Sequence, residues 1–393
     1  METYLYEWLN FVVRFLHLIT GIAWIGASFY FVWLDNSLRE PPQWKKDKGI
    51  KGDLWAIHGG GFYEVAKYSL GPEQMPKTLH WFKWEAYTTG ITGFILLTLL
   101  YYIGASSYTI DPAKMALTPW QASLIGIGAI AIFIAAYEVL CRTALVEKSL
   151  QFGLVVLAIL TVLAFGLDQL ISSRAMYIHI GAMIGLAMVF NVFTTIMPSQ
   201  RKMVEAISQG QQPDPSWGHK AKLRSVHNNY ATLPVILIMI SNHYPITYSH
   251  SYGWLILSAL IAITAYARHF FNLKHHDIIK PSILIGALIA FATLIWLFAP
   301  KAVKTEDKTV TTAQIMPIIQ SRCLQCHAAK PTDDVFKFAQ GGIMYDTEAE
   351  VLAKAERIHA RAVVSKDMPF INKTQMTDEE RQLIAQWYQG LKK

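Results

Sequence analysis

Long apolar runs recur along the first 300 residues, and a polar connection separates each run from the next. Each run is about as long as an α-helix that crosses the hydrocarbon core of a bilayer, roughly 17–25 residues. The sixth run is short and contains Pro234, so its span must include flanking residues. The pattern predicts eight membrane-spanning helices, at residues 8–33, 84–103, 122–140, 152–171, 177–197, 230–243, 253–267 and 283–299.

The distribution of Lys and Arg among the connections predicts the orientation of these spans. The only Lys and Arg residues in the connections after the second, fourth and sixth runs are Lys114 and Arg174. The other connections are rich in Lys and Arg. Positively charged connections stay in the cytoplasm. With an even number of spans, we expect both ends of the chain on the outer side of a bacterial inner membrane, in the periplasm. The first run lacks a basic leader and a small-residue cleavage pattern, so we expect it to remain in the mature protein.

The composition becomes polar after residue 300. Residues 301–308 are expected to be a linker between a membrane domain, residues 1–300, and a small helical domain, residues 309–393. Thr377 and Glu380 have the spacing of a helix capping box, and an apolar stripe follows them. The stripe contains Leu383, Ile384, Trp387 and Leu391.

Overall composition agrees with a membrane protein. The chain has 393 residues, of which 53% are hydrophobic and 16% are charged, against about 25% charged in ordinary soluble domains. The net charge of +7 is spread over both parts of the chain, so we expect no nucleic-acid partner. Three cysteines are too few for a disulfide framework.

Two of the three cysteines belong to a C-x-x-C-H motif, Cys323, Cys326 and His327, which is the attachment pattern of c-type haem. On one helical turn, the two thiols can add to the porphyrin vinyl groups and the imidazole can bind the iron. The alternatives are a chance pair or a zinc half-site, but a zinc site of this kind needs a second cysteine pair. The motif therefore predicts haem c, with Cys323 and Cys326 as covalent attachment points and His327 as an iron ligand.

A methionine on a rigid loop before the last helix is the expected second iron ligand. Met368 precedes Pro369 at such a position, while Met344 lies far from the last helix and Met376 lies at its start. Thioether ligation raises the reduction potential of a haem. The domain resembles class I cytochromes c, in which the terminal helix packs against the first one, and Trp387 is the aromatic residue expected at that contact.

Histidines on the outer side of the membrane domain are a second group of candidate ligands. His17 and His179 lie on the first and fifth spans, and imidazoles on two helices are the usual ligands of a haem b in a helix bundle. A hydrogen bond between helices is the other interpretation of a buried histidine. Both interpretations remain open.

Polar residues at the cytoplasmic side of the sixth span form the most informative cluster. Amide side chains suit a heterocycle that offers alternating N–H and C=O groups, and arginines suit an anion. A structural role in capping the span is the alternative. The cluster predicts a binding site formed by Arg224, Asn228, Asn229, Thr232 and Arg268.

Other charged residues in the spans have simpler interpretations. Glu138 and Arg142 are four positions apart and are expected to pair on one helix. Asp168 lies near the outer end of its span and is expected at the membrane interface. Glu85 is the better candidate for a general base, together with His227 of the polar cluster.

The polar cluster and the C-x-x-C-H motif together resemble a known family. The first motif is Arg224-Ser225-Val226-His227-Asn228-Asn229-Tyr230 with Leu233-Pro234, followed by Ser241-Asn242-His243-Tyr244-Pro245. Over essentially its whole length, the chain resembles the bacterial membrane-bound urate oxidases (urate hydroxylases) with a C-terminal cytochrome c domain. The resemblance implies an all-α fold, in which a bundle of eight transmembrane helices precedes a class I cytochrome c-like domain.

This resemblance also implies an activity, the oxidation of urate to 5-hydroxyisourate in purine breakdown. Electrons would pass to haem c and then to a soluble cytochrome c or a terminal oxidase, without formation of peroxide. Urate is a planar anion that suits the predicted binding residues, and His227 or Glu85 would take a proton. The hydrocarbon core is about 30 Å thick, too far for one electron hop, so a haem b between His17 and His179 would be an intermediate carrier.

Two other functions remain open at this point. A quinol-oxidising respiratory subunit would use the membrane pocket for an isoprenoid quinone. A non-catalytic electron conduit would use the polar cluster only for structure. Reduction of haem c by urate, but not by a quinol, would favour urate oxidation over both alternatives.

Overall fold

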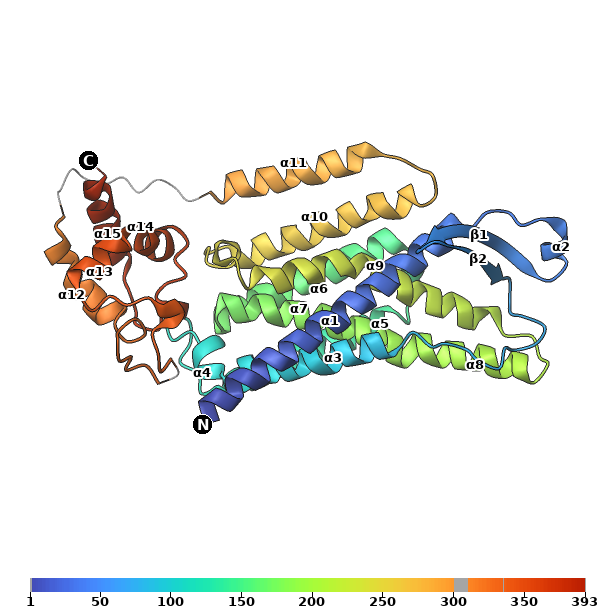
Figure 1. The fold of residues 1–393 in the computed structure, drawn as a ribbon, viewed down its shortest axis with the longest axis horizontal. Coiled ribbons are helices and arrows are strands. Elements are labelled where there is room, and N and C mark those ends of the chain that lie inside the picture. The colour runs from blue at the N-terminus through green and yellow to red at the C-terminus, as the bar shows by residue number, and fades with distance from the viewer. Residues whose placement is uncertain (1, 300–309, 335, 393) are drawn as a thin grey trace.

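The computed structural model describes residues 2–299, 310–334 and 336–392. Long, roughly parallel helices form a bundle from the first part of the chain (Figure 1). The predicted linker, residues 301–308, lies outside the described residues. The helices of the bundle are α1 (Glu2–Ser37), α3 (Trp84–Leu97), η1 (Thr98–Ile103), α4 (Ala105–Tyr108), α5 (Pro119–Leu140), η2 (Ala144–Glu147), α6 (Ser149–Leu170), α7 (Ser173–Phe190), η3 (Asn191–Ile196), α8 (Met197–Ser208), α9 (Pro215–Ser241), η4 (Pro245–Thr247), α10 (Gly253–Lys274) and α11 (Pro281–Leu297).

Each of the eight apolar runs falls on a helix or on a continuous helical run. Within the described ranges, six of these are long and apolar enough to cross a membrane: α1, α3 with η1, α5, α6, α7 with η3 and α8, and α10. The other two helices differ from these in one respect each, because α9 carries the polar cluster and α11 has only 17 residues. The long apolar helices are compatible with insertion into a membrane.

Helix α7 lies in the middle of the bundle and packs against α3, α5, α6, α9 and α10. Met176, Tyr177, Ile180 and Met183 of this helix are fully buried. Helix α7 continues into η3, a π-helical turn that begins at Asn191, and α3 likewise continues into the π-helical η1. π-helical turns inside α-helices frequently mark functional sites.

A β-hairpin between the first two long helices is an addition to the all-helical prediction. Strands β1 (Ile50–His58) and β2 (Gly61–Tyr68) pair in antiparallel register, after the short helix α2 (Gln43–Lys46). Gly59 and Gly60 form the two-residue turn with φ values of 57° and 80°, which glycine adopts without strain. Lys45 is buried and makes ion pairs with Asp53 and Glu64, which attach α2 to the hairpin.

Short helices around one hydrophobic core form the C-terminal part. Trp387 of α15 is 1% exposed and donates a hydrogen bond from Nε1 to Thr312 of α12, at 3.1 Å. The Thr377 and Glu380 capping box is present at the start of α15, as predicted. The helices are α12 (Thr312–Arg322), η5 (Gln340–Gly342), α13 (Glu348–Ala353), α14 (Ala355–Ile358), η6 (His359–Val364), η7 (Phe370–Asn372) and α15 (Asp378–Leu391).

The two ends of the bundle differ in what they carry. The start of α1 and the C-terminal helices lie at one end, and the hairpin with α2 lies at the opposite end (Figure 1). The hairpin end contains the Lys-rich segment between α1 and α3. This arrangement agrees with an even number of crossings between α1 and the C-terminal helices.

Candidate functional site

The C-x-x-C-H motif forms a turn directly after α12. The His327 amide donates to the Cys323 carbonyl oxygen at 2.9 Å, so the two cysteines and the histidine lie on one turn. The Nδ1 atom of His327 lies 3.0 Å from the carbonyl oxygen of Ile343. A carbonyl oxygen only accepts hydrogen bonds, so Nδ1 carries the proton and Nε2 keeps the lone pair that a metal ligand needs.

Burial affects the protonation of the same motif. It lowers the pKa of the His327 imidazole, which favours the neutral form. It also raises the pKa of both the Cys323 and the Cys326 thiol to about 12. In the polypeptide both cysteines are therefore neutral thiols, and neither forms a disulfide.

The candidate methionines Met376 and Met368 differ in how their side chains are packed, and Met368 stays the predicted second ligand. Met376 is 3% exposed and belongs to the core around Ile315 and Trp387, where its side chain is already packed. Met368 is half-buried, and its backbone is held at both polar groups. Its amide donates to the Arg361 carbonyl oxygen at 3.1 Å, and its carbonyl oxygen accepts from Arg381 at 2.8 Å.

The described residues contain no group of three or more His, Cys, Asp and Glu side chains that could hold a metal ion. Haem needs no such group, because the porphyrin supplies four of the iron ligands and the protein supplies one or two. The motif and Met368 thus fit a haem on the chemistry of their donor atoms.

His17 and His179 have similar hydrogen bonds but different neighbours. Nδ1 of His17 lies 3.1 Å from the carbonyl oxygen of Thr89 on α3, and Nδ1 of His179 lies 2.7 Å from that of Ala175 on α7. Nε2 of the fully buried His179 has no hydrogen-bond partner and faces α5. A methyl group on Gly126 of α5 would lie 2.3 Å from that nitrogen, so the helices pack closely there.

This packing bears on the predicted haem b. The two imidazoles contact different helices, and α5 lies directly against Nε2 of His179. The structure therefore gives no support to a porphyrin between His17 and His179, and haem b stays a prediction.

One face of α9 carries a closed hydrogen-bond network, which we call the Arg224 network. The Arg224 guanidinium binds both carboxylate oxygens of Glu138 at 2.8 Å and the side-chain oxygen of Asn191 at 2.8 Å. Asn191 in turn donates to the side-chain oxygen of Asn228 at 2.8 Å. Asn228 donates to the Met188 carbonyl oxygen at 3.0 Å.

His227 joins this network through Tyr137. The Tyr137 hydroxyl lies 2.9 Å from Nδ1 of His227 and accepts from Asn191 at 2.9 Å. The His227 ring stacks on Phe152, with ring centroids 4.4 Å apart. Thr232 donates to the Asn228 carbonyl oxygen within α9, so its hydroxyl proton is also used.

These contacts correct one prediction and add residues that the sequence analysis missed. Glu138 pairs with Arg224 on another helix. The prediction that Glu138 pairs with Arg142 on its own helix is therefore wrong. Tyr137, Asn191 and Phe152 were missed. No local sequence pattern connects Asn191 with α9. The position of this amide in an apolar run was nevertheless a signal, because a buried amide needs hydrogen-bond partners.

Another face of α9 carries a second group, the Arg268 network. Nε of Arg268 donates to the side-chain oxygen of Asn229 at 2.7 Å, and Asn229 donates to Asn272 at 2.8 Å. The guanidinium lies over the Phe29 ring of α1, 3.9 Å from its centroid. Its NH2 atom is buried without a hydrogen-bond partner, and Arg268 makes no ion pair within the described residues.

His227 and Asn229 point to opposite sides of α9, because they are two positions apart on a helix that turns 100° per residue, and Asn228 points to a direction between them. The structure thus separates His227 from Arg268. Glu85 is half-buried in the first turn of α3, and its carboxylate has no hydrogen bond or ion pair in the described part of the chain. The adjacent Ala86 packs against Val192 and Met197, next to Asn191.

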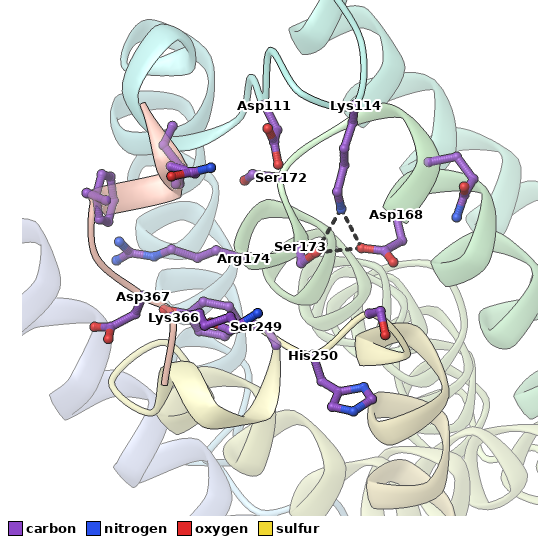
Figure 2. A pocket seen from close by; sticks show the side chains of 16 residues that line it. Asp111, Lys114, Asp168, Ser172, Ser173, Arg174, Ser249, His250, Lys366 and Asp367 are labelled. Atoms are coloured by element: carbon purple, nitrogen blue, oxygen red, sulfur yellow. Dashed lines mark hydrogen bonds and ion pairs between the residues drawn. The ribbon is translucent and has the colours of Figure 1, made fainter. Parts of the chain in front are cut away.

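A cavity of about 470 Å³ lies at the other end of the bundle, between the bundle and the C-terminal part. Figure 2 shows Lys114 bound to Asp168 and Ser173 at one side of it, and Arg174 extending toward the segment of Lys366 and Asp367. Asp168 is 5% exposed and forms an ion pair with Lys114 near the end of α6, and its expected position at the membrane interface stays a prediction.

Comparisons with known proteins identify the family of the helix bundle. No curated protein and no solved structure matches the chain. The family model described as urate oxidase N-terminal matches residues 3–299, which is most of the chain and covers both networks on α9. The match ends before the C-x-x-C-H motif. The chain therefore belongs to the urate oxidase N-terminal family.

Proposed function

We propose that this chain oxidises urate to 5-hydroxyisourate in a bacterial inner membrane and passes the electrons to a haem c in its C-terminal part. The family match supports urate oxidation by the helix bundle. The oxidation of one urate consumes one water and releases two protons and two electrons. A haem c takes one electron at a time, so it must be reoxidised between the two electron transfers from one urate. An external one-electron acceptor, such as a soluble cytochrome c or a terminal oxidase, would do this.

The unpaired guanidinium of Arg268 carries the proposal for the substrate site. A buried charge without a counter-charge is costly, so this group is expected to bind an anion. Phe29 and Asn229 hold the guanidinium by its face and by Nε, and the free NH2 atom remains available. Urate, a planar anion with amide edges, would receive hydrogen bonds from Arg268 and from the amides beside it.

Arg224 has a different role in this proposal. Its charge is neutralised by Glu138, so it orients Asn191 and Asn228 and fixes α9 against α5 and η3. Thr232 and Asn228 are likewise bound to the protein itself. They shape the site from the side of the Arg224 network.

Two residues are proposed as the base that takes a proton from urate. The Glu85 carboxylate has no polar partner in the part of the chain that the structure describes, and α3 packs against α1, which carries Phe29 of the Arg268 network. His227 belongs to the Arg224 network, where its Nδ1 is already engaged with Tyr137. We therefore favour Glu85. If Glu85→Gln keeps the wild-type turnover while His227→Gln loses it, the assignment is reversed.

The C-terminal part would hold the haem by Cys323 and Cys326 and ligate its iron by His327 and Met368. When bound, haem c supplies one-electron redox chemistry at a potential raised by the thioether ligand. The chain contributes the orientation of His327 through Ile343 and the fixed backbone of Met368. Placement of this part in the periplasm is supported by the Lys-rich connection between α1 and α3, whose hairpin lies at the other end of the bundle (Figure 1).

The test is anaerobic mixing of the purified, oxidised holoprotein with urate while the haem c absorption band is recorded. We expect urate to reduce the band, and Arg268→Gln to weaken urate binding by about 10-fold to 100-fold, the loss of a hydrogen bond to a charged group. The exposed Arg142→Gln is the matched control and should behave as wild type. Reduction by a quinol but not by urate would overturn the proposal.

Haem extraction in the same preparation tests the haem b prediction. A pyridine haemochrome spectrum gives the ratio of haem b to haem c. A protein with haem c alone would remove the His17 and His179 prediction.

A further inference from the structure

Phe370 is the centre of the contact between the C-terminal part and the bundle. Its ring lies 5.4 Å from the Tyr108 ring of α4, at an interplanar angle of 77°. The Arg174 guanidinium lies over the Phe370 ring, 5.0 Å from its centroid. Phe370 follows Met368 by two residues, so this contact fixes the segment that carries the proposed iron ligand.

Arg174 is itself anchored in the bundle. Its Nε donates to the side-chain oxygen of Asn242 at 2.6 Å, and its guanidinium lies 5.3 Å from the Tyr108 centroid. Within the described residues Arg174 has no carboxylate partner, so its charge acts on the ring faces. One cation thus touches an aromatic ring from each part, as its extension toward the segment of Lys366 and Asp367 in Figure 2 illustrates.

A series of packed rings leads from this contact into the bundle. The centroids of Tyr108 and Tyr101 are 6.1 Å apart, and those of Tyr101 and His179 are 6.0 Å apart. Tyr101 is buried, and its hydroxyl donates to the same Asn242 oxygen that Arg174 binds, at 3.3 Å. Electron tunnelling falls steeply with distance through gaps and less steeply through packed atoms, so a continuous series of rings favours transfer.

We infer that Tyr108, Arg174 and Phe370 form an electron-transfer contact, which holds the Met368 side of the C-terminal part against the outer end of the bundle. The inference rests on the proposed function. Each electron that leaves the bundle for haem c crosses at this contact. Arg174 is a positioning residue here: it keeps the two rings together and is neither oxidised nor reduced.

Single substitutions test the contact in the holoprotein. Phe370→Ala removes one ring, Arg174→Gln removes the cation, and Phe370→Trp keeps an aromatic ring as the conservative variant. Phe338→Ala is the matched control, because Phe338 is an aromatic residue of the same part that is 60% exposed. We expect urate to reduce haem c about tenfold more slowly in Phe370→Ala and Arg174→Gln, since loss of the cation–π contacts lowers the docked fraction. Phe370→Trp and Phe338→Ala should remain near wild type.

Two further measurements separate this role from damage to the haem site or the fold. The reduction potential of haem c and its rate of reduction by a small chemical reductant should be unchanged in all variants. Amide hydrogen exchange of residues 366–372 should be faster in Phe370→Ala and Arg174→Gln, with no change in α15. Equal urate-driven rates or equal exchange in these variants and the wild type would overturn the inference. If urate fails to reduce even the wild type, the proposed function fails instead.

Discussion

Arg224 of α9 and Arg268 of α10 are buried to almost the same extent, at 7% and 4% exposed. Arg224 has a carboxylate partner, Glu138, and its guanidinium also binds Asn191. Arg268 donates a hydrogen bond to the side-chain amide of Asn229 and lies over the ring of Phe29. The difference between them is therefore the counter-charge, and burial does not distinguish a structural arginine from a binding one.

The energetic consequence follows from the cost of burying a charge. A buried ion pair recovers much of its desolvation cost from its partner, and removal of one partner exposes that cost. For an unpaired buried cation the desolvation cost is not offset in the free protein. Binding of an anion offsets it. Arg224 on α9 thus stabilises the fold, and Arg268 on the neighbouring α10 is the arginine that we propose binds the substrate.

The largest expected effect comes from opening the closed network. Glu138→Gln leaves Arg224 buried without a counter-charge, so the free energy of unfolding should fall by about 3 kcal/mol, the usual cost of breaking a buried pair. Thermal unfolding of the protein in detergent measures the effect. The double variant Glu138→Gln with Arg224→Gln should recover part of the loss. A single variant as stable as wild type would contradict the role given to this pair.

Replacement of the unpaired arginine should act in the opposite direction. Arg268→Met removes a buried charge without a partner, so the unfolding free energy should rise by about 1 kcal/mol. Urate at 100 times its dissociation constant should add about 2.7 kcal/mol to the wild type and little to the variant. The same unfolding measurement with and without urate shows both effects. A destabilised variant that urate still stabilises would contradict the comparison.

Most of the helical fold could be predicted, because an apolar run of sufficient length leaves few alternatives to a helix in a membrane. The hairpin at residues 50–68 was missed although a signal was present. Gly59-Gly60 between two alternating segments is a typical two-residue turn, but it lies in a connection that was considered only for its charge. The π-helical turns η1 and η3 could not be predicted, since each depends on packing in the bundle.

The candidate site was predicted as a set of residues but not as two networks. Arg224 and Arg268 are equivalent by composition, and the partner that separates them, Glu138, is 86 positions away from Arg224. Spacing rules favoured Arg142 for Glu138 because they consider neighbours on one helix only. Asn191 connects α9 with η3 by contacts that no local pattern contains. The C-x-x-C-H motif differs in this respect, since its spacing alone defines one turn.

The smallest expected effects distinguish a hydroxyl with two polar contacts, in the Arg224 network, from a hydroxyl with one, between α9 and α10. Tyr137 is buried, and its hydroxyl contacts both His227 and Asn191, so Tyr137→Phe should lower the free energy of unfolding by about 1.5 kcal/mol. Tyr230 is half-buried, and among the described residues its hydroxyl contacts only His269, at 2.6 Å, so Tyr230→Phe should cost about 0.5 kcal/mol. Thermal unfolding of both variants in the same detergent gives the ratio. If Tyr230→Phe costs more than Tyr137→Phe, the Arg224 network is not more tightly bonded than this contact between α9 and α10.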